Sequence, residues 1–217
     1  ITRLLKNITK YSVKLTNPNL CLYELQKALH IAKSGRPGPV WIEIPLDIQS
    51  SKVDNLKKLK RFKPKLQKNK NINKHLEKIY KKLLNSKKPL FAIGNGLKQS
   101  GSLNIFNKIK KKLNIPFVNT RFGNDLYPYS EKLNMGLAGI KGMPYTKNLT
   151  DECDLMIALG CRFAPTFCMG NPKTFLKNAY IISINNDSNE LNLDLKKIDL
   201  KINCSLNYFL KGFYQYI

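Results

Sequence analysis

An almost unbroken apolar run follows Asp154 and reads Leu155-Met156-Ile157-Ala158-Leu159, ending at Gly160. Because apolar and polar residues do not alternate along it, the run is typical of a strand buried on both faces, as in a parallel sheet. The segments 89–93, 115–118 and 180–184 have the same character, and 197–202 is a further candidate strand. We therefore expect the chain to be built on a buried parallel sheet.

Helical patterns lie between these strands. Apolar residues recur at helical spacing in 73–85, 102–113 and 206–216, and shorter helices are expected near 145–152 and just before the strand at 180–184. Strands that alternate with helices predict a sheet covered on both faces. Residues 72–217 are therefore predicted to form an α/β domain with a Rossmann-like, doubly wound parallel sheet.

Residues 1–50 show a smaller pattern of the same kind. A helix is expected over 20–33, where Ser34-Gly35 ends it, and a strand over 39–44, which Pro45 ends. One helix and one or two strands are too few for a complete domain. We therefore predict a partial α/β domain, the C-terminal part of a larger one. Because the chain begins with Ile1 in the middle of a pattern, we also expect the natural N-terminus to lie upstream.

Residues 51–71 differ from both flanking regions because they are rich in lysine and lack periodic apolar residues. A basic binding strip and a solvated linker between domains are the two interpretations, and the linker is favoured. The predicted boundaries are therefore 1–50 for the partial domain, 51–71 for the basic linker and 72–217 for the Rossmann-like domain.

Composition excludes several classes of protein. With 217 residues, of which 42% are hydrophobic and 24% charged, the chain matches ordinary globular proteins rather than disordered, collagen-like or disulfide-rich ones. No apolar run reaches the ~18 residues that a membrane-spanning helix needs. A membrane partner is therefore not expected.

The formal net charge of +24 would fit a nucleic-acid partner. However, only five of the 38 basic residues are arginine, whose paired donors suit phosphates and guanines better than lysine does. The excess of lysine, together with asparagine and isoleucine, is typical of a chain encoded by an AT-rich genome. Nucleic-acid binding is therefore not expected, although it stays an alternative.

The five cysteines are scattered without a Cys-x-x-Cys pair, and two histidines accompany them. Zinc sites need paired ligands at short spacing, so no metal site is expected. Free thiols suit a reducing compartment, and we expect a cytoplasmic protein.

Ligands of doubly wound sheets bind beyond the carboxyl ends of the strands. Gly94 and Gly96, at one such end, resemble a dinucleotide fingerprint, but a tight strand-to-helix turn explains them equally well. Arg162, at another, is placed either to meet an anion or to pair with a neighbouring acidic side chain. The strand ends that would form the crevice carry Gly94-Asn95-Gly96, Asn119-Thr120, Gly160-Cys161-Arg162 and Asn185-Asn186-Asp187.

The segment 33–49, which includes Ser34-Gly35-Arg36-Pro37-Gly38-Pro39-Val40, closely resembles the end of the pyrimidine-binding domain of acetolactate synthase-like, thiamine diphosphate-dependent enzymes. The segments 87–90, 136–142 and 154–163 are similar to the central domain of the same family. The resemblance implies a carboligase or decarboxylase of 2-oxo acids, of the kind used in branched-chain amino acid biosynthesis. It also implies thiamine diphosphate and Mg²⁺ as cofactors and a homodimer or tetramer of full-length subunits.

The family resemblance also indicates what this chain lacks. Members of the family activate the cofactor with a glutamate early in the first domain and hold Mg²⁺ with a Gly-Asp-Gly motif in a third domain. Here the glutamates before residue 50 are Glu24 and Glu43, neither of which matches, and no such motif occurs. The chain is therefore expected to be an inactive fragment without catalytic or metal-binding residues. A related 2-oxo acid decarboxylase or acyltransferase, and a non-catalytic Rossmann-like nucleotide-binding module, are the alternatives.

Some relatives bind FAD in the central domain, and the resemblance admits FAD in the crevice of this chain. Three positions depart from the family pattern: Lys141 stands in place of histidine, Ala164-Pro165-Thr166 in place of Asp-Asp-Arg, and Asn185 in place of aspartate. Because polar contacts are lost, we expect a colourless protein. The residues matched to flavin contacts are Gly96, Thr120, Arg121, Phe122, Gly139, Ile140, Lys141, Gly142, Gly160, Arg162 and Asn185.

Overall fold

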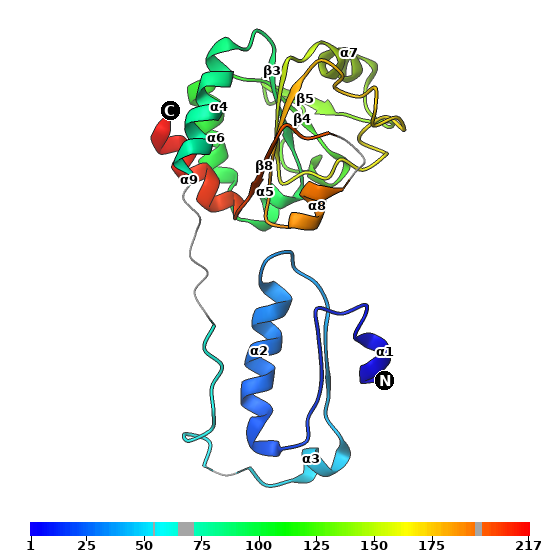
Figure 1. Ribbon diagram of the computed structural model, residues 1–217, viewed down its shortest axis with the longest axis vertical. Coiled ribbons are helices and arrows are strands. Elements are labelled where there is room, and N and C mark those ends of the chain that lie inside the picture. Colours follow the sequence, from blue (N-terminus) through cyan, green and yellow to red (C-terminus); the bar gives the residue numbers. More distant parts are fainter. Residues whose placement is uncertain (54, 65–71, 194–196) are drawn as a thin grey trace. The chain divides into compact units, whose positions relative to one another are not determined.

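The computed structural model describes residues 1–53, 55–64, 72–193 and 197–217 (Figure 1). The chain forms two compact units, Ile1–Lys68 and Asn69–Ile217, each of which is described by itself. The boundary between the units lies inside the expected linker, and the division into a partial domain, a linker and a complete domain stays a prediction. Within the described residues, no helix has both the length and the apolar character needed to cross a membrane.

The larger unit contains a six-stranded sheet in which neighbouring strands are all parallel. The strand order is β5-β4-β3-β6-β7-β8, so the chain moves outward from β3 to β5, returns to β6 beside β3, and moves outward again to β8. This arrangement confirms the Rossmann-like, doubly wound parallel sheet. The strands are β3 (Pro89–Ile93), β4 (Phe117–Asn119), β5 (Asn134–Leu137), β6 (Leu155–Leu159), β7 (Tyr180–Asn185) and β8 (Leu200–Asn203).

Alternate residues of each strand pack on opposite faces of the sheet, which explains the unbroken apolar runs. Phe91 and Ile93 of β3 belong to one hydrophobic cluster, whereas Leu90 and Ala92 belong to another. The first cluster is covered by three helices that lie together on one side of the sheet in Figure 1: α4 (Asn73–Asn85), α6 (Leu103–Leu113) and α9 (Leu206–Tyr216). On the opposite side, α7 (Pro144–Glu152) contributes Leu149 to the second cluster.

Four elements of the larger unit were not expected from the sequence. One is the edge strand β5, and the other three are short helices that follow strand ends. These helices are α5 (Asn95–Gln99), η2 (Arg121–Gly123) and α8 (Ser188–Asn192). Because they begin where strands end, they contribute side chains to the predicted ligand crevice.

The short helix expected just before β7 is absent. Residues 165–170 and 172–178 form turns instead. Met169, Gly170 and Leu176 adopt positive φ angles of 55°, 75° and 51°, which a right-handed helix does not admit, and Pro165 lacks the amide hydrogen that a helix interior would use. Three aromatic rings, in contact one after the other, cover the sheet in place of the expected helix: Phe163, Phe167 and Phe175.

The smaller unit pairs β1 (Tyr11–Lys14) in parallel with β2 (Val40–Glu43), and α2 (Cys21–Lys33) packs on both strands. The Tyr11 hydroxyl donates to Glu24 and accepts from Lys27, so a polar contact ties α2 to β1. Among the described residues of this unit, only Leu15 and Ala28 are buried hydrophobic side chains. The core is therefore small. The remaining elements are α1 (Thr2–Leu5), η1 (Pro18–Leu20) and α3 (Leu46–Ser50).

The basic segment before residue 65 is attached to α2. The Phe62 ring centroid lies 5.7 Å from that of Tyr23 and 5.4 Å from that of His30. The Phe62 amide donates to Gln26 Oε1 (3.0 Å), and Lys60 Nζ lies 4.8 Å from the centre of the Tyr23 ring. Part of the expected linker therefore packs on the smaller unit.

Candidate ligand crevice at the strand ends

The direction of the strand order reverses between β3 and β6, and doubly wound sheets bind ligands beyond the carboxyl ends of the strands at such a point. Gly94 follows β3 and Gly160 follows β6, while Thr120 follows β4 and Asn185 ends β7. These strands are neighbours in the sheet. The structure therefore brings the four strand ends named from the sequence to one edge of the sheet.

The glycine turns after β3 and β6 pack directly against each other. A Cβ atom on Gly96 would lie 2.7 Å from Gly160 Cα, and one on Gly94 would lie 2.4 Å from the Gly160 carbonyl oxygen. Gly160 has a φ of +61°, and its carbonyl accepts a hydrogen bond from the Gly96 amide (3.2 Å). Close packing within the chain therefore accounts for all three glycines.

Arg162 is paired with an acidic side chain. Its Nε lies 2.8 Å from Glu190 Oε2, and only 7% of the Glu190 side chain is exposed, against 57% for Arg162. Glu190 lies on α8, after β7, which pairs with β6, and it was not predicted as a site residue from the sequence. Of the two alternatives for Arg162, the structure shows the salt bridge.

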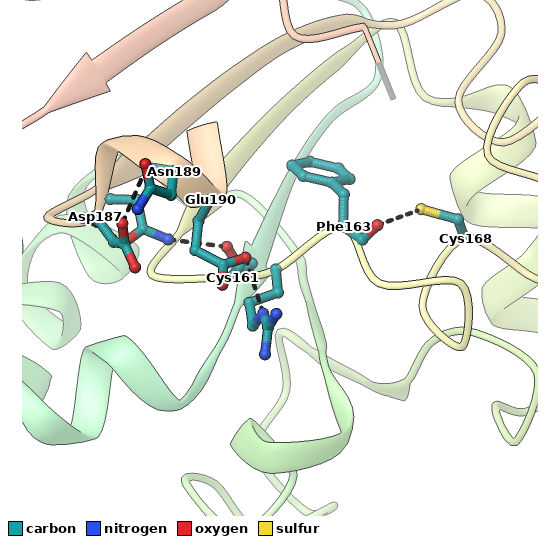
Figure 2. A network of polar contacts seen from close by, with 8 residues as sticks. Cys161, Phe163, Cys168, Asp187, Asn189 and Glu190 are labelled. Carbon is teal, nitrogen blue, oxygen red and sulfur yellow. Dashed lines mark hydrogen bonds and ion pairs between the residues drawn. The ribbon is translucent and has the colours of Figure 1, made fainter. Parts of the chain in front are cut away.

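Asn185 is hydrogen-bonded at both ends of its amide. Its Nδ2 donates to the Cys161 carbonyl (3.2 Å), and its Oδ1 accepts from the Asp187 amide (3.1 Å). Asp187 in turn accepts from the Asn189 amide (3.0 Å) at the start of α8, and Figure 2 shows Asp187 and Asn189 together with Cys161. The polar residues after β7 thus connect the ends of two strands.

The loop after β5 is also packed by its glycines. Gly139 has a φ of +105°, and a Cβ atom there would lie 2.4 Å from the Thr166 carbonyl oxygen. A Cβ on Gly142 would lie 2.4 Å from the Leu137 carbonyl oxygen. Between the two glycines, Ile140 and Lys141 are exposed. Close packing at the two glycines therefore restricts the backbone of the loop, and the loop exposes one apolar and one basic side chain to solvent.

An open pocket of about 500 Å³ lies beside the helices that follow β3 and β4. Lys98 and Asp125 form an ion pair there, and the Arg121 guanidinium lies 5.8 Å from the centre of the Phe122 ring. Arg121, Phe122 and Asn95 were expected at the crevice from the sequence, whereas the remaining lining residues were not. Their signal was available, because the segments after two adjacent strands meet at one edge. The lining residues are Asn95, Lys98, Arg121, Phe122, Asn124 and Asp125.

The end of β4 is fixed by two polar residues. The Thr120 hydroxyl donates to the Ile93 carbonyl (3.2 Å), and Asn119 Nδ2 donates to Asn134 Oδ1 (2.7 Å). Asn119 is fully buried, and its Oδ1 has no hydrogen-bond partner within the part of the chain that the structure describes. These contacts couple β4 to both of its neighbours in the sheet.

The residues matched to flavin contacts fall into two sets. FAD needs free donors for its phosphates and acceptors for its ribityl hydroxyls. One set is engaged by atoms of the chain itself: Gly96, Thr120, Gly139, Gly142, Gly160, Arg162 and Asn185. The other is exposed at the rim: Arg121, Phe122, Ile140 and Lys141. The residues present therefore fit a flavin poorly.

Neither Cys161, which follows β6 at the crevice, nor Cys153, which precedes β6 at the opposite edge of the sheet, supports thiol or metal chemistry. Within the described ranges, no group of three or more His, Cys, Asp or Glu side chains could hold a metal ion. Burial raises the pKa of Cys153 to about 12 and also raises the pKa of Cys161. Because the thiolate is the reactive form, these two thiols are poor nucleophiles at neutral pH.

Comparison with known protein families shows the family to which this chain belongs. The family model described as "Thiamine pyrophosphate enzyme, central domain" matches residues 76–212. The chain belongs to this family. The matched residues run from α4 to α9 and include the whole six-stranded sheet, so the sheet and its helices are those of a thiamine pyrophosphate (thiamine diphosphate) enzyme.

Individual relatives agree with this family assignment. The acetolactate synthase large subunit of Lactococcus lactis is 32% identical over 196 residues, which are 90% of this chain and 34% of that protein. A probable acetolactate synthase large subunit of Methanocaldococcus jannaschii is 29% identical over 87% of this chain and 32% of that protein. The resemblance to acetolactate synthase-like enzymes is therefore confirmed, and the chain spans about a third of the length of these curated relatives.

A solved structure has the same fold. It is described as a putative thiamin diphosphate-dependent enzyme from Mycobacterium smegmatis and superimposes with a TM-score of 0.81 at 15% sequence identity. The match covers 100% of this chain and 41% of that one. At this identity the likeness supports the fold of the thiamine pyrophosphate enzyme and nothing beyond it.

Proposed function

We propose that this chain forms the middle part of a thiamine diphosphate-dependent carboligase that acts on 2-oxo acids, like the acetolactate synthases. The observation that carries the proposal is the 32% identity with an acetolactate synthase large subunit over 90% of the chain. That identity extends beyond the family-model match at 76–212 into the smaller unit. A non-catalytic nucleotide-binding module would not account for similarity in both units.

In this proposal the chain is a scaffold that does not hold the cofactor. Thiamine diphosphate, when bound, supplies an electron sink that lets a 2-oxo acid lose CO₂. Its diphosphate needs a divalent cation with oxygen ligands, and no suitable group of acidic side chains occurs among the described residues. Thiamine diphosphate and Mg²⁺ would therefore be bound by parts of the enzyme that this chain does not contain, and residues 1–217 alone would be inactive.

The proposal extends to assembly and location. The full-length subunits would form a homodimer or tetramer, as the family resemblance implies. Cytoplasmic location is proposed from the free thiols at all five cysteines, which suit a reducing compartment.

The crevice at the strand ends is proposed to hold no flavin. The purified chain should be colourless, because Arg162 is paired with Glu190 and Asn185 is satisfied by the backbone. An absorption spectrum of the protein as isolated checks this. A yellow preparation whose flavin band is lost in an Arg162→Ala variant would show that the crevice is a working FAD site.

The carboligase proposal is tested by a graft. The segment of the Lactococcus lactis acetolactate synthase large subunit that aligns with this chain is replaced by the corresponding residues of this chain. Acetolactate formation from pyruvate is then measured with thiamine diphosphate and Mg²⁺ present. The hybrid should form acetolactate, because the foreign segment supplies the same scaffold.

A hybrid with Gly160→Val is the matched control, since a side chain there meets the Gly96 backbone and should abolish the activity. Circular dichroism and gel filtration establish that the unsubstituted hybrid is folded and assembled. A folded hybrid that binds thiamine diphosphate but forms no acetolactate would contradict the proposal.

A further inference from the structure

The helical layer that covers one face of the large sheet is strongly basic on its outer side. Glu77 is the only acidic residue on α4, α6 and α9, and it is paired with Lys81 at 2.6 Å. Another lysine, Lys110, is buried and paired with Glu131 (2.7 Å), so it does not contribute to the outer surface. The exposed lysines of the three helices are Lys74, Lys78, Lys81, Lys82, Lys108, Lys111, Lys112 and Lys211.

The lysine-rich composition of the chain does not by itself explain this layer. Elsewhere in the larger unit, acidic side chains are interspersed with the basic ones and pair with them. Such pairs are Lys88–Glu152, Lys98–Asp125, Lys147–Asp151, Arg162–Glu190 and Lys197–Asp199. A bias of composition would add lysines to every surface, but it would not remove acidic residues from one layer only.

The lysines of the layer lie in stripes. Lys74, Lys78 and Lys82 are spaced four residues apart on α4, which places them along one side of the helix. Lys108 and Lys112 have the same spacing on α6, and both ammonium groups lie 5.9 Å from the centre of the Tyr214 ring. α9 contacts both α4 and α6, so the stripes border a common surface. This surface, formed by the eight exposed lysines, is called the lysine layer below.

We propose that the lysine layer is a docking surface for an acidic segment of a partner protein. A row of ammonium groups in which Glu77 is the only competing carboxylate attracts a polyanion and raises the rate at which it binds. Lysine ammonium groups are point charges on flexible stems, so they can follow carboxylates whose positions are not fixed. The inference stands on this charge distribution and does not require the carboligase proposal.

Two observations favour an acidic protein over a nucleic acid. None of the five arginines lies on α4, α6 or α9, so the bidentate donors that suit phosphates and guanines are missing. The aromatic rings nearby are also engaged: Tyr80 and Tyr216 pack edge to face at 5.7 Å, and Tyr214 lies beneath two lysines. Single-stranded nucleic acids bind to rings that are free to stack on bases.

The test compares two variants of the full chain that have the same net charge. One carries Lys78→Glu, Lys82→Glu and Lys112→Glu in the lysine layer. The other carries Lys132→Glu, Lys173→Glu and Lys177→Glu, which are exposed lysines outside the three helices. Binding of a poly-glutamate peptide is measured at physiological salt by fluorescence anisotropy. The layer variant should bind at least about tenfold more weakly than the unsubstituted chain, whereas the control should lose less than about threefold.

Three outcomes would overturn the proposal. Equal losses in the two variants would mean that net charge alone attracts the peptide. No measurable binding by the unsubstituted chain would mean that the layer does not recognise acidic segments. Tighter binding of a duplex or single-stranded oligonucleotide than of poly-glutamate, lost in the layer variant only, would assign the surface to nucleic acid. Circular dichroism and a parallel set of Lys→Gln variants at the same positions separate charge effects from misfolding.

Discussion

Gly160 shows most clearly what a single residue contributes at the strand ends. Gly160 and Gly101 have similar positive φ angles, +61° and +63°, but a Cβ on Gly160 would meet the Gly96 backbone at 2.7 Å, whereas a Cβ on Gly101 would meet nothing within 4 Å. Gly160→Ala should therefore lower the free energy of unfolding by at least about 2 kcal/mol, from strain and overlap together. Urea denaturation measures the change.

Gly101→Ala is the matched control for this prediction. An alanine at position 101 would adopt the same unfavourable positive φ, but its Cβ would not overlap any other atom. The substitution should therefore lower the free energy of unfolding by about 1 kcal/mol. If the two variants are equally stable, the close packing of the turns after β3 and β6 is not what requires glycine at Gly160.

The ion pair between Lys110 and Glu131 predicts a dependence of stability on pH. The hydrogen bond from Lys110 holds the pKa of Glu131 below its ordinary value of 4.5. Because the pKa is lower in the folded state, the contribution of Glu131 is fully present above pH 4.5 and is lost as the pH falls through the lowered pKa. Glu131→Gln should therefore destabilise the protein most near neutral pH, where it leaves the buried ammonium without its partner.

The measurement is the free energy of unfolding of both proteins between pH 3 and 7, a range chosen to span the ordinary carboxyl titration. The difference between them should shrink at the acid end. A difference that stays constant over the whole range would show that the carboxylate charge of Glu131 does not stabilise the fold.

For single residues at the site, the position at a strand end could be predicted from the sequence, but the side chain or backbone group that each one contacts could not. The sequence placed Arg162 and Asn185 at strand ends, because unbroken apolar runs mark where buried strands stop. It left open whether Arg162 meets an anion or an acidic side chain, since Glu190 is 28 residues away and lies on a short helix without a clear pattern. The pairing of a loop residue with a residue on a distant short helix is a tertiary property that spacing does not encode.

The segment 55–64 supports a prediction about proteolysis. Lys57 and Lys58 lie in an exposed turn in which the Lys58 amide donates to the Asn55 carbonyl (2.9 Å). Phe62, in contrast, packs on α2 and shields the bond after Arg61. Limited trypsin digestion should therefore cut first after Lys57 or Lys58, because exposed segments with few contacts are cleaved preferentially.

Mass spectrometry of the early fragments identifies the cut. A Phe62→Ala variant should make the bond after Arg61 as sensitive as the first sites, whereas Phe62→Leu should preserve much of the protection. First cuts inside 89–185, with the basic segment intact, would contradict both the predicted linker and the compactness of the sheet.

Elements with a continuous apolar pattern were predicted well, and elements without one were not. β3, β6 and β7 are buried on both faces, so composition alone marks them. β5 is an edge strand that begins with the polar Asn134 and contains a glycine with a φ of +82°, so it carries no such signal. The helix expected before β7 does not form, because residues with positive φ angles and a proline impose turns there.

At the scale of the whole molecule, the family resemblance indicated a class of function, which the strand and helix patterns could not do. Alternating strands and helices predict a doubly wound sheet, but many unrelated functions occur on such sheets. The segment 33–49 resembles acetolactate synthase-like enzymes in particular, and similarity over most of the chain supports that assignment. The chemistry itself could not be read from this chain, because in the proposed function the cofactor is bound by other parts of the enzyme.

The central claim is that this chain is a scaffold of a thiamine diphosphate enzyme and does not hold the cofactor itself. Isothermal titration calorimetry of the 217-residue chain with thiamine diphosphate and Mg²⁺ tests it most directly. We predict no saturable binding in the micromolar range and no release of CO₂ from pyruvate in the same buffer. Micromolar binding of thiamine diphosphate that requires Mg²⁺ would contradict the account, because it would place a complete cofactor site within these residues.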